Sequence, residues 1–336
     1  MGQLSGQKPA KRARVGRRRA LDKDIPVSPE NPFDISMAPE VIVPCARDAL
    51  PKTRRKGKQR ALKLAWSDQD AGIWLYEANC LTFLDRVAER WPDGVFDMIF
   101  ADPPYFLSNG GISCHAGRMV SVDKGDWDKS RGIEENHEFN RAWLERCQRV
   151  LKPNGTIWVS GTAHVIHSVG FAMQQLGFKL LNDITWVKPN PPPNLSCRYF
   201  THATETIIWA AKHAKSKHHF DYRRMKKIAG DKQMKSVWEF RPPGRAEKIY
   251  GKHPTQKPEA LIARIVEAST SKGDLVLDPF AGSGTTAVAA ARQDRRVVGV
   301  ELEPHFVARA AARVKDVLLT KLQRDTGRSA RQGRGD

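Results

Sequence analysis

Short apolar segments alternate with amphipathic segments of helical length along most of this chain of 336 residues, and this alternation limits the folds open to it. Seven segments have the length and composition of strands: 73–76, 96–101, 156–160, 181–187, 205–211, 275–278 and 297–301. Six segments have a helical pattern: 80–90, 138–151, 164–176, 258–270, 284–293 and 304–318. Such an order predicts an α/β fold with a mainly parallel sheet and helices on both faces. Ligands of such sheets bind at the carboxyl ends of the strands.

Basic residues outnumber acidic ones, and the excess is concentrated in three segments. Lys and Arg together number 56 against 37 Asp and Glu, which gives a net charge of +19. Residues 1–60 and 212–252 each carry +9, and residues 315–336 carry +3. This distribution suits a polyanionic partner, with nucleic acid as the first candidate. A basic surface that serves solubility is the alternative.

The two ends of the chain differ in composition from the alternating part. Residues 1–60 contain runs of Arg and Lys and repeated prolines without an apolar face, and residues 319–336 are polar and rich in Gly and Arg. Both ends are expected to be disordered basic tails. They flank one domain at 61–318, within which residues 212–252 are an insertion.

Several classes of protein are disfavoured by what the sequence lacks. No apolar run approaches the roughly 20 residues that cross a bilayer, and the basic N-terminus lacks the apolar stretch of a signal peptide. The five cysteines are scattered, which fits a reducing cytosol and gives no support to a zinc site. His213, His218 and His219 have no Cys or carboxylate at ligand spacing, so no metal is expected. We therefore expect a cytoplasmic protein.

An early motif, Asp102-Pro103-Pro104-Tyr105, directly follows the strand predicted at 96–101. The two prolines have a fixed φ and no N–H, so their carbonyls are rigid acceptors. An exocyclic amino group has two N–H donors, which the Asp102 carboxylate and the Pro103 carbonyl can accept. Tyr105 can stack on the ring that bears this amino group. The motif therefore indicates a clamp for the amino group of a nucleobase.

A late motif follows the strand predicted at 275–278. Asp278 ends that strand, and Gly282 and Gly284 permit a tight turn that a ligand can approach closely. The following helix offers free amide groups at its N-terminus, and Glu301, at the end of the next strand, can accept both hydroxyls of a ribose. Thr285 stands where a phosphate-binding loop has its Lys. This favours a nucleotide cofactor bound through ribose and a carboxylate or amine over a triphosphate.

These motifs resemble those of the S-adenosylmethionine-dependent DNA amino-methyltransferases. The resemblance rests on DPPY at 102–105, HPTQKP at 253–258 and DPFAGSGTT at 278–286, and it covers roughly residues 70–318. Asp126-Trp127-Asp128 and the strand from Ile184 to Lys188 are similar as well. In this family, an aspartate motif that precedes the cofactor motif marks the permuted β group.

The resemblance implies a fold and an arrangement of functions along the chain. The fold is a Rossmann-like, seven-stranded, circularly permuted sheet with one antiparallel strand, and the two strands that usually come first are the last here. Residues 212–252 correspond to the target-recognition region, where one of the basic segments lies. Residues 106–111 and 125–128 are similar to those of β-group enzymes from GATC-type systems.

The resemblance also assigns residues to S-adenosylmethionine. The turn contacts the methionine part of the cofactor through Asp278, Pro279, Phe280, Ala281, Gly282, Ser283, Gly284 and Thr285. Glu301 binds the ribose, and Asn79 meets the adenine. His253, Thr255 and Lys257 lie on the side of the cofactor carboxylate. The expected DNA contacts are Lys188, Asn190, Arg223, Arg224, Lys226, Lys227 and Arg241.

The expected reaction is methylation of adenine N6 in DNA, with Asp102 as a hydrogen-bond acceptor for the amino group. An aspartate in the first clamp position goes with adenine in this family. Cytosine N4 methylation is the alternative, followed by RNA base methylation and by a DNA-binding relative without turnover. The expected partner is double-stranded DNA, with single-stranded DNA as an alternative. We also expect a bacterial or phage origin, a monomer or homodimer, and a cognate restriction endonuclease that acts on the same site.

Overall fold

The computed structural model describes residues 62–108, 112–115, 118–121, 128–251 and 253–332. Most of its strands form one sheet in the order β1-β2-β11-β10-β3-β6-β8-β7-β9. Their bounds are β1 Lys63–Asp68, β2 Ile73–Glu77, β3 Phe96–Ala101, β6 Leu151–Gly161, β7 Lys179–Val187, β8 Thr204–Ala211, β9 Val237–Glu239, β10 Leu275–Asp278 and β11 Arg296–Glu301. The strands β4 Ile112–His115 and β5 Arg118–Ser121 form a separate antiparallel pair.

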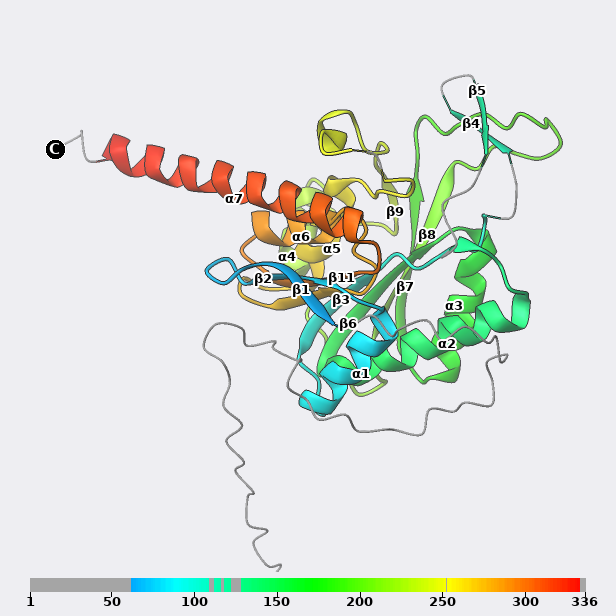
Figure 1. Ribbon diagram of the computed structural model, residues 1–336, viewed down its shortest axis with the longest axis horizontal. Coiled ribbons are helices and arrows are strands. Elements are labelled where there is room, and N and C mark those ends of the chain that lie inside the picture. Colours follow the sequence, from blue (N-terminus) through cyan, green and yellow to red (C-terminus); the bar gives the residue numbers. More distant parts are fainter. Residues whose placement is uncertain (1–61, 109–111, 116–117, 122–127, 252, 333–336) are drawn as a thin grey trace, which may run out of the picture. The chain divides into compact units, whose positions relative to one another are not determined.

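The helices cover both faces of the sheet (Figure 1). Their bounds are α1 Cys80–Arg90, α2 Ile133–Val150, α3 Ala163–Gln175, α4 Tyr222–Ile228, α5 Glu259–Ser269, α6 Thr285–Arg292 and α7 Pro304–Gln332, with a short 3-10 helix at Ala246–Lys248. In Figure 1, α1, α2 and α3 lie on one face, and α5, α6 and α7 lie on the other. No helix in the described part of the chain is both long and apolar enough to span a bilayer.

The core forms where apolar side chains of the central strands meet α5, α6 and α7. Met98 and Phe100 of β3 alternate with residues that face the opposite side, as the period of two in a strand requires. Trp158 stacks on Trp209 with ring centroids 4.6 Å apart, and its indole N–H donates to Ser269 Oγ at 3.1 Å. The buried indole nitrogen therefore has a partner on α5.

The predicted α/β class and all seven predicted strands are confirmed. They are the seven central strands of the sheet, and β8 is the strand that runs antiparallel to its two neighbours. The last strands of the chain, β10 and β11, lie between β2 and β3, as the permuted order predicts. The sequence did not indicate β1 and β9, which add one strand to each edge.

The expected disordered tail at 319–336 is wrong over residues 319–332, because α7 continues to Gln332. Val314 and Val317 are buried, and Leu318 packs against the core. One turn further on, Lys321 Nζ pairs with the Asp294 carboxylate. These contacts extend the packed side of α7 as far as Lys321, just beyond the helix predicted at 304–318. The tail expected at 1–60 lies outside the described residues.

Part of the basic segment 212–252 belongs to the sheet. β9 pairs in parallel with β7, and Trp238 at its centre is 5% exposed. Met225 of α4 is also buried, and Asp221 N donates to Ala268 O at 2.9 Å where α4 meets α5. The target-recognition role of this segment stays a prediction.

Candidate active site

Asp102 directly follows β3, and both oxygens of its carboxylate accept hydrogen bonds. Oδ1 accepts from the hydroxyls of Tyr105 and Ser160, each at 2.6 Å. Oδ2 accepts from Lys257 Nζ at 2.6 Å. Ser160 lies near the end of β6, which is parallel to β3, so both side chains reach the carboxyl edge of the sheet. These donors fix the orientation of the carboxylate.

A second carboxylate, that of Glu205, lies next to this group. Glu205 is near the start of β8, and because β8 is antiparallel to β6, its first residues lie at the edge where Asp102 lies. One Glu205 oxygen lies 3.6 Å from Lys257 Nζ and 3.3 Å from the Tyr105 hydroxyl. The other accepts from Lys188 Nζ at 2.6 Å. Two carboxylates and two ammonium groups thus alternate within one network.

The paired charges compensate for the burial of these groups. Lys257 is 5% exposed, and although burial opposes its charge, Asp102 and Glu205 raise the pKa of its ammonium group above the ordinary value. Burial likewise opposes the charge on Glu205, but Lys257 and Lys188 lower the pKa of its carboxyl group below the ordinary value. Lys257 and Glu205 therefore remain ionised at neutral pH.

The loop that carries the early motif is held by the buried carboxylate of Asp128. Its Oδ1 accepts from the backbone N–H groups of Tyr105 and Phe106, each at 2.8 Å. Its Oδ2 accepts from Leu107 N at 3.3 Å and from the Ser108 hydroxyl at 2.8 Å. Phe106 has a φ of 58°, a costly conformation for a residue with a Cβ. Asp128 therefore stabilises a strained turn that begins beside Asp102.

The other residues of the early motif are buried as well. Pro103 and Pro104 are buried, and Tyr105 is 6% exposed. The Tyr105 ring lies 5.2 Å from Lys257 Nζ, within range of a cation–π interaction. Tyr105 thus contributes its hydroxyl to the support of Asp102. That its ring stacks on a nucleobase stays a prediction.

The late motif forms a tight turn between β10 and α6. Asp278 Oδ1 accepts from Phe280 N at 3.0 Å, and Oδ2 accepts from the Thr286 hydroxyl at 2.5 Å. Burial raises the pKa of Asp278 to about 7. Gly282 and Gly284 have φ values of 50° and 77°. A Cβ on Gly284 would lie 2.6 Å from Ala310 Cβ, so only glycine fits there.

Glu301 connects the turn to the end of β11. Its carboxylate accepts from Gly282 N at 2.8 Å and from Glu303 N at 2.9 Å, while burial raises its pKa above the ordinary value. The backbone of Ala78 bonds to Glu301 O at 2.9 Å, which brings Asn79 to the same edge. The Asn79 side chain accepts from two amides at the start of α1, so it caps that helix. Its predicted contact with adenine stays a prediction.

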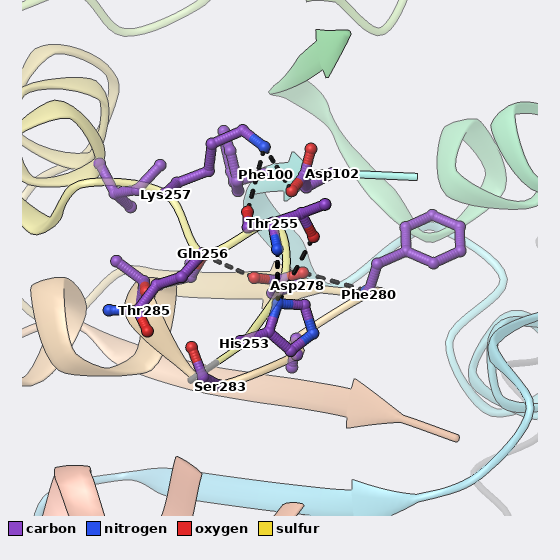
Figure 2. A pocket seen from close by; sticks show the side chains of 14 residues that line it. Phe100, Asp102, His253, Thr255, Gln256, Lys257, Asp278, Phe280, Ser283 and Thr285 are labelled. Atoms are coloured by element: carbon purple, nitrogen blue, oxygen red, sulfur yellow. Dashed lines mark hydrogen bonds and ion pairs between the residues drawn. The ribbon is translucent and has the colours of Figure 1, made fainter. Parts of the chain in front are cut away.

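One pocket opens on both motifs and on the HPTQKP segment (Figure 2). Its lining includes Phe100, Asp102, His253, Thr255, Gln256, Lys257, Ile262, Asp278, Phe280, Ala281, Gly282, Ser283, Thr285 and Thr286. The sequence predicted most of these residues as cofactor ligands, and the structure brings them together. Asp102 of the early motif and the turn of the late motif therefore share one cavity.

The pocket has features that suit a polar ligand. Gly282 allows the backbone of the turn to lie close to the His253 ring, because a Cβ on residue 282 would be only 3.0 Å from His253 Nε2. Gln256 Oε1 is buried and has no hydrogen-bond partner among the described residues, so a donor on a ligand would satisfy it. Burial lowers the pKa of His253 to about 4. His253 is therefore neutral at pH 7, and Lys257 is the cation of the HPTQKP segment in this pocket.

The sequence pattern of a known family matches residues 96–312, a stretch that contains every motif of this site. That family is described as DNA methylase. The chain belongs to this family. It is therefore an enzyme that methylates DNA.

Individual relatives of this DNA methylase agree with the assignment. It is 59% identical over 242 residues to the type II methyltransferase M2.DpnII of Streptococcus pneumoniae, covering 72% of this chain and 89% of that protein. It is 47% identical over 256 residues to M2.MboI of Moraxella bovis, covering 76% and 92%. The crystal structure of the M1.HpyAVI–SAM complex is similar with a TM-score of 0.56 and 27% identity, covering 72% and 98%.

The structure separates the residues that were predicted to contact DNA into two groups. Lys188, Asn190 and Arg241 follow β7 and β9 at the carboxyl edge of the sheet, where Lys188 pairs with Glu205. The four basic residues of α4 lie elsewhere: Arg223, Arg224, Lys226 and Lys227. Arg224 Nε pairs with Glu267 Oε1 at 2.5 Å near the end of α5. The 11 residues of α5 place this end ~16 Å from its start beside the pocket.

Sequence reasoning missed the roles of Ser160, Glu205 and Asp128. Ser160 and Glu205 carry no motif, and their common position follows only from the antiparallel pairing of β6 with β8. The signal that was available is that each is a polar residue at one end of an apolar strand. Asp128 belongs to the Asp126-Trp127-Asp128 segment, which resembles the methyltransferase family. Its hydrogen bonds to the early motif could not be predicted from that resemblance.

Proposed function

We propose that this DNA methylase transfers the methyl group of S-adenosylmethionine to the exocyclic N6 of an adenine that has left the DNA helix. The observation that carries the proposal is the single pocket on which Asp102 and the 278–285 turn both open. A donor in the turn and an amino group at Asp102 are thereby neighbours. Holding two reactants in this way supplies a large part of the acceleration in a transfer reaction.

The residues of the turn are suited to hold the cofactor. The backbone at Gly282 and Gly284 allows close approach, and Glu301 at the neighbouring strand end offers carboxylate lone pairs to the ribose hydroxyls. Thr255 and Gln256 line the same pocket. The bound cofactor supplies a methyl group on a positively charged sulfur, which is an electrophile and leaves as a neutral thioether.

Asp102 orients the target amino group and accepts its hydrogen bond. The lone pair of an aromatic amine is delocalised into the ring, and an accepted hydrogen bond shifts the nitrogen towards the geometry of a nucleophile. The nitrogen forms its bond to the methyl carbon as the bond from that carbon to sulfur breaks. The proton that the amino group must then lose passes to Asp102 or to water. The Pro103 carbonyl is the second acceptor for this group.

Lys257 and Glu205 keep the charge around Asp102 balanced. An unpaired carboxylate in a buried site is costly, and an adjacent ammonium group offsets this cost. The ion pair at 2.6 Å places the Lys257 ammonium group on Asp102 Oδ2, while the hydroxyls of Tyr105 and Ser160 occupy Oδ1. This arrangement supports a role of Asp102 as an acceptor more than as a base that removes a proton before attack.

The DNA site and its context are part of the proposal. The similarity of residues 106–111 and 125–128 to enzymes of GATC-type systems supports GATC as the target. Relatives named type II methyltransferases support a cognate endonuclease that acts on the same site. The position of Arg241 after β9, at the carboxyl edge of the sheet, supports a contact with that DNA.

The test is transfer of a labelled methyl group to DNA, followed by mass analysis of the nucleosides. Short duplexes with one GATC site and with a scrambled site are compared. We expect N6-methyladenine in the first duplex only. N4-methylcytosine would contradict the assignment of the base, label in both duplexes would contradict the assignment of the site, and absence of label in both would contradict the activity.

A further inference from the structure

The loop between β7 and β8 exposes a cluster of large apolar side chains. Phe200 is 96% exposed, Tyr199 is 61% exposed and Leu195 is 50% exposed. Single exposed apolar residues are common on protein surfaces and need no explanation. Three within six consecutive residues of one loop form a patch, and such patches mark interaction sites.

The loop has a defined conformation that presents Phe200 to solvent. Asn194 Nδ2 donates to Tyr199 O at 2.6 Å, and Asn194 Oδ1 accepts from both the backbone N–H and the hydroxyl of Ser196, at 3.0 and 2.8 Å. Tyr199 also packs beside His202, with ring centroids 5.5 Å apart. The consecutive prolines 191–193 restrict the backbone before this turn. The tip is therefore held in place before any partner binds.

Both ends of the loop are anchored in the active site. Lys188 N donates to Ala203 O at 2.8 Å, which closes the base of the loop. Lys188 Nζ pairs with Glu205, which lies 3.3 Å from the Tyr105 hydroxyl. The tip therefore extends from the same edge of the sheet that carries Asp102.

The charge of the loop suits nucleic acid. Residues 188–203 contain Lys188, Arg198 and His202 and no acidic residue. A surface that combines basic groups with exposed aromatic rings matches DNA, whose phosphates take the charge and whose bases offer faces for stacking. Lys188 already pairs with Glu205, but a purely apolar partner would leave Arg198 without a counterpart.

We propose that Phe200 is a wedge that enters the duplex beside the target and stacks in the space that the extruded base leaves. This inference rests on the proposed function, because extrusion is needed only when chemistry takes place on a base. Apolar side chains that enter a base step unstack it and make extrusion easier. Tyr199 and Arg198 then contact the strand beside the wedge.

Three DNA probes distinguish a wedge from a general contact. They are a paired duplex with one GATC site, the same duplex with an abasic position opposite the target, and the single strand. The variant is Phe200→Ala, and Phe200→Trp should retain activity because it can stack. Phe171→Ala is the matched control, since Phe171 is 56% exposed on α3. We expect Phe200→Ala to methylate the paired duplex at least tenfold more slowly than the wild type does. On the other two probes, its rate should lie within twofold of the wild-type rate.

A second readout does not depend on turnover. With 2-aminopurine at the target position, the wild type should increase the fluorescence of the paired duplex, and Phe200→Ala should increase it much less. Equal fluorescence in the two proteins, or an equal loss of rate on all three probes, would overturn the wedge. A wild type that transfers no methyl group contradicts the proposed function instead, and the comparison of fluorescence still decides the inference.

Discussion

Lys257 Nζ lies 2.6 Å from Asp102 Oδ2, and this ion pair joins the HPTQKP segment to the early motif across the pocket. The two residues are 155 positions apart in the sequence. Because both side chains are largely buried, the loss of either partner would leave a buried charge without its counterion.

Replacing Lys257 by Met should destabilise the fold, since it leaves two buried carboxylates without their shared cation. We expect a loss of about 3–5 kcal/mol in the free energy of unfolding, measured by urea denaturation. Lys272→Met is the control. Lys272 also forms an ion pair, with Asp294 at 2.7 Å, but its side chain is 77% exposed. That variant should lose at most about 1 kcal/mol. Equal losses would contradict the structural role of Lys257.

Replacing Asp102 by Ala should remove methyl transfer and leave cofactor binding intact. The alanine has no acceptor for the amino group, so the rate should fall by about 10²–10⁴-fold or more. Labelled methyl transfer measures the rate, and calorimetry measures the cofactor dissociation constant. Near-normal turnover in this variant would disprove the role of the carboxylate.

Replacing Asp128 by Asn should slow transfer although Asp128 has no place among the reacting groups. The amide offers one oxygen where the carboxylate accepts from three backbone N–H groups and one hydroxyl. The loop then shifts, and we expect kcat to fall at least about tenfold with an unchanged dissociation constant for the cofactor. Ser108→Ala removes one of these donors and should have a smaller effect. If both variants match the wild type, the loop does not depend on Asp128.

Replacing Glu301 by Ala should weaken cofactor binding at least several-fold, because the ribose loses its acceptor and Gly282 N loses its partner. Glu301→Gln retains an acceptor and should lie between this variant and the wild type. Calorimetric titration with S-adenosylmethionine measures the affinities. An unchanged dissociation constant for Glu301→Ala would refute the ribose role.

His253 should make stability depend on pH in the acidic range. Its pKa in the folded protein is about 4, below the ordinary value of 6.5, because burial disfavours the charged ring. The unfolded chain therefore binds more protons between these values, and the stabilising contribution of His253 decreases as the pH falls from 6.5 to about 4. The unfolding free energy of the wild type minus that of His253→Gln should decrease as the pH falls from 6.5 to about 4. A difference that is constant with pH would contradict the burial of a neutral ring.

The sequence allowed the site to be located because its two motifs directly follow apolar strands. Parallel strands bring their carboxyl ends to one edge, so Asp102 and Asp278 could be placed together without coordinates. Glu205 could not be placed in this way, because its position depends on the reversed direction of β8. The length of α7 was missed for another reason. Its last turns are polar and rich in Arg, and the contacts of Leu318 and Lys321 come from tertiary structure.

The placement of β10 beside β3 has a consequence for how this protein is synthesised. Val276 of β10 pairs with Met98 of β3. The centre of the sheet therefore forms only after β10 has been synthesised, long after β3. A nascent chain that ends before residue 278 contains residues 102–105 but lacks the turn at 278–286. Such a chain cannot form the whole pocket. Contacts between such distant residues slow folding. The pocket that Asp102 lines therefore cannot be complete before residues 278–286 have been synthesised.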